Sequence, residues 1–575
     1  ARKVCSTGRW EEANTGLLQR AQALLAASDS DDAVGAWVKW RAALHTEYHV
    51  VTKRWAAARA LHRRQRSAQD RKNLRKLYFR SMKMATEQII DGDTKMGNIT
   101  GEQLQEYIEE MYSAPTGTVL GSVGDAERKA EQIADTTIYR GAADGAGPLS
   151  MRDIFRDVHP WPSALCAHFT PIELMEAMEA RATRTAAGWT GAHIDARLRL
   201  PPAAAVFLSM CANLFIVQWA MAPAWMLIAV VKFLAKEPVV TDVKKHVRMI
   251  VLMTDALKDL GCAVLRRMTV SAVAQWLYSP WNKAYRKNVD GPLEHLFRCQ
   301  EMLEQARRER SDIAVVWVDL RKFFDMVNFG GAFFCLRYTG VPIWMVRWIV
   351  FCMMNVVLVL MHPVTGEASA IFKPTRSTAQ GAAWSTEIAN RMVECAGRAV
   401  GHLDVGATVG GTAYPTGPVK VTYGTQCDDC HIVVKLTPRT SEAVDIMLRV
   451  MLLFGLHGAV RKSQVVMRRA GRLVSPAEHG VSMRDEDGEL RPVPALSDCE
   501  LTAPLRVTEW FRTVRPTLQH ARPTDSNAPS AQPAKGAMRW LGGVVTDAPG
   551  AQAAVWRLEL AELEHALWCV ERCSL

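Results

Sequence analysis

The pattern of hydrophobic and polar residues changes along this chain. Residues 8–112 are rich in Ala, Leu, Arg, Lys and Glu, and two long stretches within them, 10–27 and 36–84, contain no proline. Such composition favours helices. A looser stretch with several glycines, 113–147, follows and predicts a domain boundary near residue 150.

The longest apolar run, residues 201–231, contains no charged residue and by its length alone is a candidate membrane span. Prolines interrupt it, Asn213 and Gln218 lie inside it, and it divides near Met221. Two short buried helices explain the run as well as a span does, and we expect the helices. A second uncharged stretch, 348–361, predicts a core helix that leads into a strand.

After residue 310 the sequence pattern predicts both strands and helices. The run 313–318 is β-branched and ends at Asp319, which predicts a buried strand. Two further strand-like runs, within 419–426 and 431–435, flank Cys427–Cys430 and predict a hairpin with acids at its tip. The predicted helices are 341–356, 383–399, 441–456 and 554–570. An α+β or α/β core after a helical N-terminal part is therefore expected.

Composition narrows the class of protein. Hydrophobic residues make up 49% and charged residues 22% of the 575, which excludes wholesale disorder. Thirteen cysteines, an odd number scattered along the chain, suit a reducing compartment, and no secretory signal is visible. We therefore expect a nuclear or cytoplasmic location. Because the chain begins at Ala1, we also expect a piece of a longer polyprotein.

The net charge of +11 is concentrated in one segment. Between Lys53 and Lys83 there are twelve Lys or Arg and a single acid, Asp70. Such a segment attracts polyanions, nucleic acid first and anionic membrane second, while a solvated helix face remains the alternative. The expected nucleic-acid contacts are Lys53, Arg54, Arg63, Arg64, Arg66, Arg71, Lys72, Arg75 and Lys76.

Acids at strand ends are the candidate chemistry. If the strand that ends at Asp319 lies beside the hairpin that carries Asp428 and Asp429, three carboxylates converge. Such hard oxygen ligands suit Mg²⁺, which keeps waters and substrate phosphates as its other ligands. Two ions about 3.5–4 Å apart would hold the attacking and leaving oxygens of a phosphoryl transfer. An Asp-Asp pair alone carries little information, since Asp31-Asp32 is a second copy.

Several sequence blocks in a fixed order are more informative than the Asp-Asp pair. They are Val318–Asn328, Gly340–Ile349, Ser377–Ser385, Gln426–Cys430, Phe454–Ser463 and Met538–Gly543, preceded by Phe169–Ala177, Thr185–Ile194, Pro223–Trp225, Lys236 and Arg248–Ile250. Together they resemble the conserved motifs of reverse transcriptases of the non-LTR retrotransposon (LINE) and group II intron kind. The resemblance spans residues 169–570.

The resemblance implies a right-hand polymerase of α+β class with fingers, palm and a partial thumb. The implied parts are a basic helical N-terminal extension at 1–150, fingers at 151–310, a palm at 311–470, an irregular insertion at 471–537, and the palm–thumb junction at 538–575. It implies RNA-directed DNA polymerase activity with dNTPs, on template RNA and a primer or target DNA. Two Mg²⁺ ions, or Mn²⁺, would be the cofactors. No membrane is expected as a partner.

The resemblance also implies residue roles. Asp319 and Asp428, with Asp429 beside them, would hold the metal ions. Phe324 would clash with a 2′-hydroxyl, the group that separates ribose from deoxyribose. Gln380 and Gly381 would line the nucleotide pocket, since glycine lets backbone approach closely.

Three cations complete the implied site. Arg248 and Lys236 would neutralise the triphosphate, and Lys462 would protonate the departing pyrophosphate. Lys232, Lys244 and Lys245 lie near Lys236 in the sequence and are alternatives to it.

Some positions depart from the family pattern. The family usually has an aromatic and a small residue before the Asp pair, where this chain has Gln426 and Cys427. It usually has a basic residue before the glutamine, where this chain has Ala379. A glycine is usual where Ser377 stands, and a small residue usually precedes the aromatic residue, where this chain has Phe323. A catalytically degenerate nucleic-acid-binding relic of the same fold is therefore the alternative.

Other interpretations carry less weight. An RNA-dependent RNA polymerase conflicts with Phe324, and a membrane protein would rest on 201–231 alone. Cys427-x-x-Cys430-His431 spells a haem-attachment motif but lacks an export signal. As half of a zinc site, the same cysteines would need a partner pair such as Cys569 and Cys573.

Overall fold

The structure is a computed structural model. It describes residues 101–115, 117–141, 147–181, 202–235, 242–243, 247–274, 277–284, 291–361, 368–409, 419–437, 439–475, 481–484, 489–496, 500–501, 534–535, 537–540 and 543–546. The basic residues expected between Lys53 and Lys76, Lys236, and the helix expected at 554–570 lie outside these ranges.

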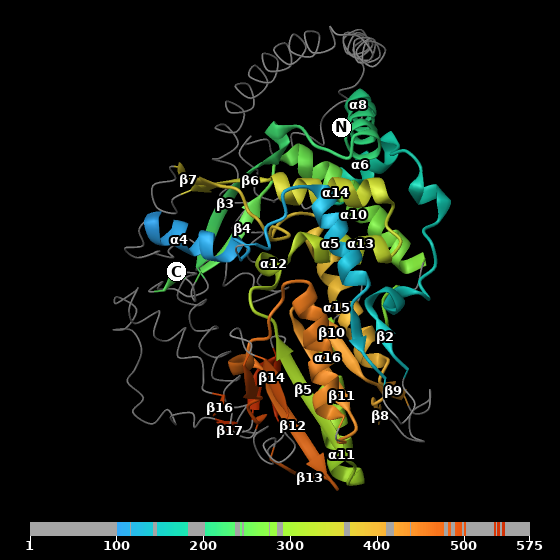
Figure 1. Ribbon diagram of the computed structural model, residues 1–575, viewed down its shortest axis with the longest axis vertical. Helices are drawn as coiled ribbons and strands as arrows, with labels where there is room; N and C mark the ends of the chain where they lie inside the picture. Colours follow the sequence, from blue (N-terminus) through green and yellow to red (C-terminus); the bar gives the residue numbers. More distant parts are fainter. Residues whose placement is uncertain are drawn as a thin grey trace, which may run out of the picture.

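A five-stranded antiparallel sheet carries the C-terminal half of the fold, in the lower part of Figure 1. Its order is β10-β11-β5-β12-β13. The strands are β5 (Ile313–Asp319), β10 (Tyr423–Gln426), β11 (Asp429–Val434), β12 (Gln464–Arg469) and β13 (Arg472–Leu473). The strand and the hairpin expected from the sequence are confirmed.

Helices cover both faces of this sheet. Val315 and Trp317 of β5 pack with Leu303 of α11 (Gly291–Glu309). The intervening Val316 and Val318 belong to the larger core, which includes α15 (Ser385–Gly401) and α16 (Thr440–Leu453). Because successive side chains of a strand point to opposite faces, a strand covered on both sides must be apolar throughout, as β5 is.

A smaller sheet of four strands has the order β4-β3-β6-β7 and lies at the upper left of Figure 1. Its strands are β3 (Ile228–Ala235), β4 (Val247–Leu252), β6 (Val357–Met361) and β7 (Ala368–Phe372). β3 and β6 run parallel, and the other pairs are antiparallel. The expected helix-to-strand transition within 348–361 is confirmed by α14 (Ile343–Asn355) and β6.

The uncharged run 201–231 differs in part from expectation. Its first half is helical, as α8 (Pro202–Ala212) and a π-helical turn, η3 (Asn213–Gln218). The second half is not a helix: a 3₁₀ turn, η4 (Ala224–Leu227), leads directly into β3. The β-branched residues of β3 find a parallel partner in β6, which local pattern does not reveal. Within the described residues no helix has the length and apolar character that crossing a membrane requires.

Within the described residues, two helices precede the boundary expected at residue 150, α4 (Gly101–Tyr112) and α5 (Val123–Ala134). The loose stretch expected at 113–147 thus contains a helix, which begins at the N-cap Ser122, whose side chain accepts from the Asp125 backbone N–H. Both helices contribute to the larger core, and α5 packs against α13 (Phe329–Tyr338). The core therefore extends across residue 150.

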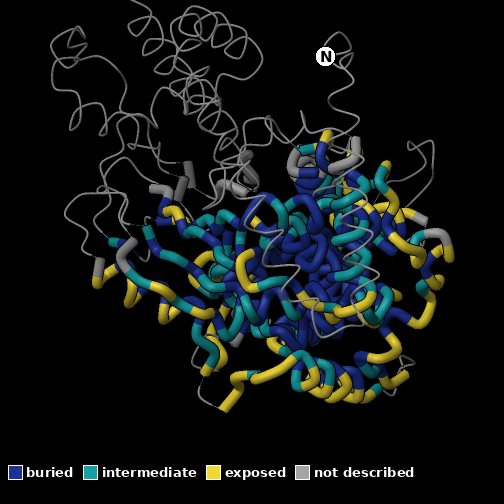
Figure 2. The backbone as a smooth tube through the Cα atoms, turned by 90° about the horizontal axis from the view of Figure 1, so that it is seen from above, coloured by how far each residue is buried: buried dark blue, intermediate teal, exposed yellow. Residues whose placement is uncertain are grey.

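The remaining helices surround α5 and α13 on the right of Figure 1. A capping box starts α6: Thr170 accepts from the Glu173 backbone N–H and Glu173 returns the bond. The other elements in this region are α6 (Pro171–Glu179), α10 (Asp255–Ala274), η1 (Met151–Phe155), η2 (Ser163–Cys166), β1 (Thr137–Tyr139) and β2 (Leu149–Ser150). The short α12 (Phe323–Met326) lies to the left of α5 in Figure 1 and contacts α4. Figure 2 shows the buried residues gathered at the centre of the described part and the exposed residues along its periphery.

Two short antiparallel strand pairs, β14 with β15 and β16 with β17, lie in the expected insertion. β18 pairs with β19 at the start of the expected palm–thumb junction, and β8 pairs with β9 within the expected palm. The bounds of these strands and of the 3₁₀ turn η5 are β8 (Ala407–Val409), β9 (Val419–Val421), η5 (Val460–Lys462), β14 (Ser482–Arg484), β15 (Leu490–Pro492), β16 (Glu500–Leu501), β17 (Ala534–Lys535), β18 (Ala537–Trp540) and β19 (Gly543–Thr546).

Candidate active site

The pairing of β5 with β11 brings the strand-end acids together. In this antiparallel pair Asp429 lies directly opposite Asp319. Directly opposed residues share one face of a sheet, with their Cβ atoms about 4.5–5.5 Å apart. Both side chains are only partly exposed. Two carboxylates from positions 110 residues apart in the chain therefore meet at one end of the sheet.

Asp428 reaches the same place through a tight turn. Gln426 pairs with Asp429, so Cys427 and Asp428 form a two-residue hairpin loop. Only the first of them, Cys427, has a positive φ, of 60°, which is the pattern of a type II′ turn and a position that favours glycine. The turn holds Asp428 at the hairpin tip, next to Asp429.

Electrostatics shows that these acids interact. The pKa of Asp429 is raised to about 7, mainly by burial and also by the negative charges of Asp428 and Asp319, while Lys462 opposes the rise. Like charges within a few ångströms disfavour ionisation of a carboxyl. The site thus has more negative potential than its own residues neutralise, which a cation would relieve.

Lys462 forms an ion pair with Asp319, with Nζ 3.6 Å from Oδ2. It lies on η5, in the loop that follows α16 and runs along the end of β5. The Asp319 carbonyl accepts from the Ala459 backbone N–H at 2.8 Å, and the Arg321 N–H donates to the His457 carbonyl at 2.9 Å. The sequence-predicted Lys462 therefore does lie beside the acids, although its side chain is largely exposed.

The segment that contains Gln380 has an unusual backbone. Ser377, Ala379 and Gly381 all have positive φ, at 114°, 60° and 115°. The Val251 N–H of β4 donates to the Gln380 carbonyl at 2.8 Å. A Cβ added at Gly381 would lie 2.4 Å from the Val251 carbonyl oxygen. Only glycine fits there, so the sequence-based reason for Gly381, close backbone approach, applies to β4.

Phe324 lies on the short α12, one turn beyond Asp319, and is tied to the same segment. Its carbonyl accepts from the Thr378 N–H at 2.9 Å, and the Ser377 N–H donates to the Val327 carbonyl at 2.8 Å. The Phe324 ring is half-buried and meets the buried Phe323 edge to face, with 5.6 Å between ring centroids. The structure thus brings Phe324 and Gln380 onto adjoining loops.

The two expected phosphate-neutralising cations have different outcomes. Arg248 is exposed on β4, three residues before Val251. Lys236 lies outside the described residues. Lys232, which the sequence left as an alternative, pairs across from Ile250 and so shares a face with Arg248. Lys232 and Arg248 are diagonal neighbours on that face, about 7–8 Å apart by strand geometry.

The donor set fits Mg²⁺ in kind. Across the described ranges no three His, Cys, Asp or Glu side chains are arranged as a metal site. Mg²⁺ does not need three, because proteins usually bind it through one or two carboxylates plus substrate phosphates and water. The opposed Asp319 and Asp429, with Asp428 adjacent, supply that many hard oxygen donors.

The cysteines of the hairpin do not suit haem or zinc. Cys427 and Cys430 are both buried free thiols, and the Cys430 Sγ donates to the Cys427 carbonyl at 3.7 Å. Burial raises the pKa of Cys430 well above its usual value, and the nearby acids add to the effect. Covalent attachment needs an accessible thiol, and zinc needs a thiolate. Cys569 and Cys573 lie outside the described residues.

Sequence reasoning missed residues of α4 that border this site. Lys322 Nζ donates to the Tyr107 hydroxyl, and Arg376 Nε donates to the Met111 carbonyl at 2.9 Å. The signal was present as an apolar stripe with helical spacing, Leu104, Tyr107, Ile108 and Met111. Its partners, over 200 residues away, were not readable.

No known family model and no curated protein matches this chain.

Proposed function

We propose that this chain is an RNA-directed DNA polymerase of the non-LTR retrotransposon kind. The observation that carries the proposal is the β5–β11 pairing, which sets Asp319 opposite Asp429 with Asp428 in the adjoining turn. Phe324 follows the end of β5, and Gln380 lies beside β4. Backbone hydrogen bonds join the two segments that carry these residues. In this proposal the five-stranded sheet is the palm and the four-stranded sheet belongs to the fingers.

Each side chain has a task in nucleotide transfer. Asp319 and Asp428, with Asp429, would hold two Mg²⁺ ions, or Mn²⁺. When bound, such ions stabilise the attacking and leaving oxygens of phosphoryl transfer. Arg248 and Lys232 form a basic face on the four-stranded sheet that suits the triphosphate. Lys462, 3.6 Å from Asp319, is near enough to the acids to give a proton to the departing pyrophosphate.

Sugar selection would come from Phe324. Its backbone is fixed by Thr378 and its ring is braced by Phe323, so the ring cannot easily retreat from a bulkier sugar. A ribonucleotide adds one hydroxyl at the point that an aromatic ring would fill. The expected substrates are therefore dNTPs, with template RNA and a primer or target DNA as partners, in the nucleus or cytoplasm.

The test is primer extension on an RNA template with Mg²⁺, with dNTPs and rNTPs supplied separately. Asp428→Asn removes one anionic ligand and should lower extension by more than the roughly 10–100-fold that loss of an outer-shell partner costs. Asp445→Asn is the matched control, since Asp445 pairs with Arg449 on the surface of α16. If the wild type extends the primer and Asp428→Asn extends it equally well, these acids are not part of the mechanism.

The second candidate, a nucleic-acid-binding relic of the same fold, is favoured by one observation. Cys427 occupies a positive-φ position in the turn that carries Asp428, where a side chain is strained. A chain that binds RNA with salt-dependent affinity but extends no primer with either nucleotide would support the relic.

A further inference from the structure

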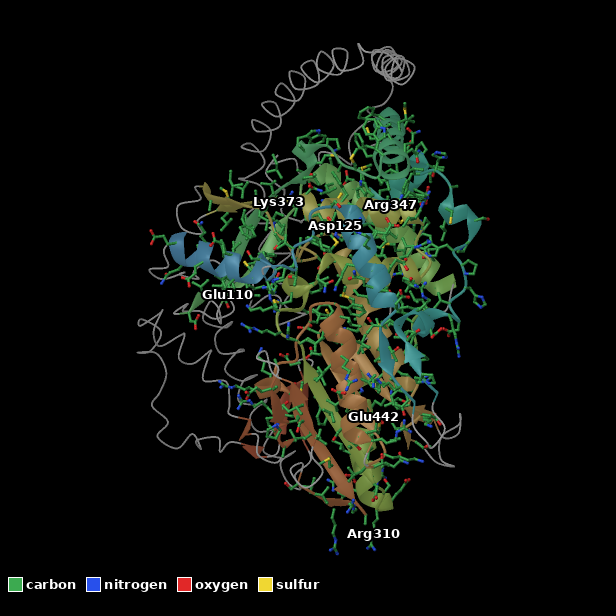
Figure 3. The ribbon with its side chains drawn as sticks, in the orientation of Figure 1. Glu110, Asp125, Arg310, Arg347, Lys373 and Glu442 are labelled. Atoms are coloured by element: carbon green, nitrogen blue, oxygen red, sulfur yellow. The ribbon has the colours of Figure 1, made fainter. Side chains whose placement is uncertain are left out.

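Helix α4 lies beside the four-stranded sheet at the left of Figure 1 and contacts both α12 and β7. Its buried face holds Leu104, Tyr107, Ile108 and Met111, and Tyr112 at its end is also buried. Figure 3 marks Glu110 on this helix. The helix comes from the N-terminal region, yet its polar contacts go to two segments beside the candidate active site.

The first contact is with the loop between β5 and α12. Lys322 Nζ donates to the Tyr107 hydroxyl and lies 5.0 Å from the centre of its ring. Arg321 forms an ion pair of 3.7 Å with Glu110. Lys322 has a φ of 45°, a left-handed conformation that residues with a side chain disfavour. The loop therefore depends on outside contacts to keep its shape.

Tyr112 lies one turn further along. Its hydroxyl is buried near Asp325 and has no hydrogen-bond partner among the described residues. Burial raises the pKa of Tyr112 well above its usual value, and Asp325 raises it further. Asp325 directly follows Phe324, and Ser377 begins the segment that contains Gln380.

The second segment caps the C-terminal end of α4. The Thr375 and Arg376 N–H groups donate to the Tyr112 carbonyl at 2.9 and 3.2 Å. The Arg376 guanidinium donates to the Met111 and Glu110 carbonyls at 2.9 and 2.7 Å. α4 has no basic residue in its own last turn, so Arg376 supplies the cation that a helix C-terminus favours.

We infer that α4 positions the nucleotide pocket by holding the Phe324 loop and the Ser377–Gly381 segment against each other through Tyr107, Tyr112 and Arg376. The two segments meet directly through backbone bonds, Thr378 to Phe324 and Ser377 to Val327, and the Ser377 and Thr378 hydroxyls also donate to the Phe324 carbonyl, each at 3.3 Å. Both contain backbone conformations that side chains disfavour, at Lys322, Ser377 and Ala379. A helix that fixes both from one side sets how far Phe324 stands from the nucleotide sugar. This inference rests on the proposed function.

The test uses the full chain with Tyr107→Phe, which keeps the ring and removes only the hydroxyl that Lys322 bonds, and with Arg376→Met, which removes the guanidinium that bonds the Met111 and Glu110 carbonyls. Gln105→Ala is the control on the exposed face of α4, where Gln105 bonds only to Glu109. Each variant should raise the KM for dNTPs about 2–10-fold, the equivalent of one hydrogen bond, and should raise rNTP use relative to dNTP use. Gln105→Ala should change neither, and kcat should change less than KM in all three.

A second measurement does not need activity. Hydrogen–deuterium exchange at the Ser377 and Thr378 amides, whose partners are the Val327 and Phe324 carbonyls, reports whether the two segments stay joined. Exchange should accelerate in Tyr107→Phe and Arg376→Met and not in the control. Unchanged exchange would overturn the inference whether or not the chain extends primers.

The activity result separates the two proposals. Faster exchange in an active enzyme with an unchanged rNTP-to-dNTP ratio would also overturn the positioning role. A wild-type chain that extends no primer would instead count against the proposed function, while the exchange result would still decide whether α4 joins the loops.

Discussion

Gly381→Ala is the substitution whose effect the structure defines best. Gly381 has a φ of 115°, and a Cβ placed on it would lie 2.4 Å from the Val251 carbonyl oxygen, inside the 3.0 Å that Cβ atoms need. The obstacle is backbone of β4, which cannot rotate away as a side chain would. Relief requires the Ser377–Gly381 segment to separate from β4, and the 2.8 Å bond from the Val251 N–H to the Gln380 carbonyl would break.

The expected cost has two parts. The positive φ alone costs a non-glycine residue about 1–3 kcal/mol. Breaking the Val251–Gln380 bond adds about 0.5–1.5 kcal/mol, or up to about 3 if a buried group stays unpaired. Gly117→Ala isolates the first part, because Gly117 has a φ of 87° and nothing within 4 Å of its added Cβ. The unfolded-state gain from replacing glycine is common to both variants and cancels.

The assay is urea denaturation of the two variants and the wild type, with exchange at the Val251 amide as a local reporter. Gly381→Ala should lower the free energy of unfolding by about 1–3 kcal/mol more than Gly117→Ala does, and should accelerate exchange at Val251. Equal losses of stability, with Val251 still protected, would refute the close approach between the segment and β4.

Three more outcomes are expected. Phe324→Ala should raise rNTP use relative to dNTPs while part of the dNTP activity survives; an unchanged ratio in primer extension would make Phe324 a core residue only. Burial raises the pKa of Glu394 above its usual value despite the opposing Arg398, so its stabilising contribution is present below about pH 4.5 and is lost as the pH rises through the folded pKa. Urea denaturation between pH 4.5 and 7.5 should show a smaller decline for Glu394→Gln, and identical slopes would contradict this. The logarithm of the affinity for single-stranded RNA should fall linearly with the logarithm of the salt concentration, with a slope of about −0.7 per phosphate neutralised. A chain beginning at residue 101 should lose most of that slope. Salt-independent binding would rule out the role of residues 53–83.

The truncation point in the last experiment follows from the structure. A boundary at residue 150 was the expectation from sequence, because 113–147 contains glycines and lacks a strong apolar pattern. α5 forms there nonetheless, with small buried residues, Ala126 and Ala130, packed against α13. A truncation at 150 would remove α4 and α5 from the shared core, whereas one near residue 101 leaves both in place.

Local pattern was sufficient where an element is set by its own residues. β5 is apolar at every position before Asp319, so its burial on both faces and its polar end were readable. The hairpin of β10 and β11 was readable because its strands are β-branched and its loop is polar. β3 was misjudged as a helix, because its partners are β4 and β6 and the latter starts 129 residues later. A short apolar run does not by itself distinguish a helix from a strand.

At two positions where this chain departs from the family pattern, the structure shows how the neighbouring residues accommodate the change. Ser377 stands where the resemblance has a glycine, and its φ of 114° is a conformation that favours glycine. Its hydroxyl offsets part of that strain, since Oγ accepts from the Ala379 N–H at 2.8 Å and donates to the Phe324 carbonyl at 3.3 Å. The hydroxyl therefore adds a bond between the two loops that a glycine would not make.

Gln426 shows a different kind of accommodation. It stands where the resemblance has an aromatic residue, and its Oε1 would lie 2.1 Å from a Cβ added at Gly291, the first residue of α11. Gly291 thus leaves the room that the Gln426 side chain occupies, although Oε1 is buried without a hydrogen-bond partner among the described residues. The geometry of the acid-bearing hairpin is preserved at the expense of one unpaired polar atom. Because Ser377 and Gln426 each have a matching neighbour, the departures alone do not argue that the fold around Asp319 and Asp428 has been lost, and primer extension is the measurement that separates an active enzyme from a relic.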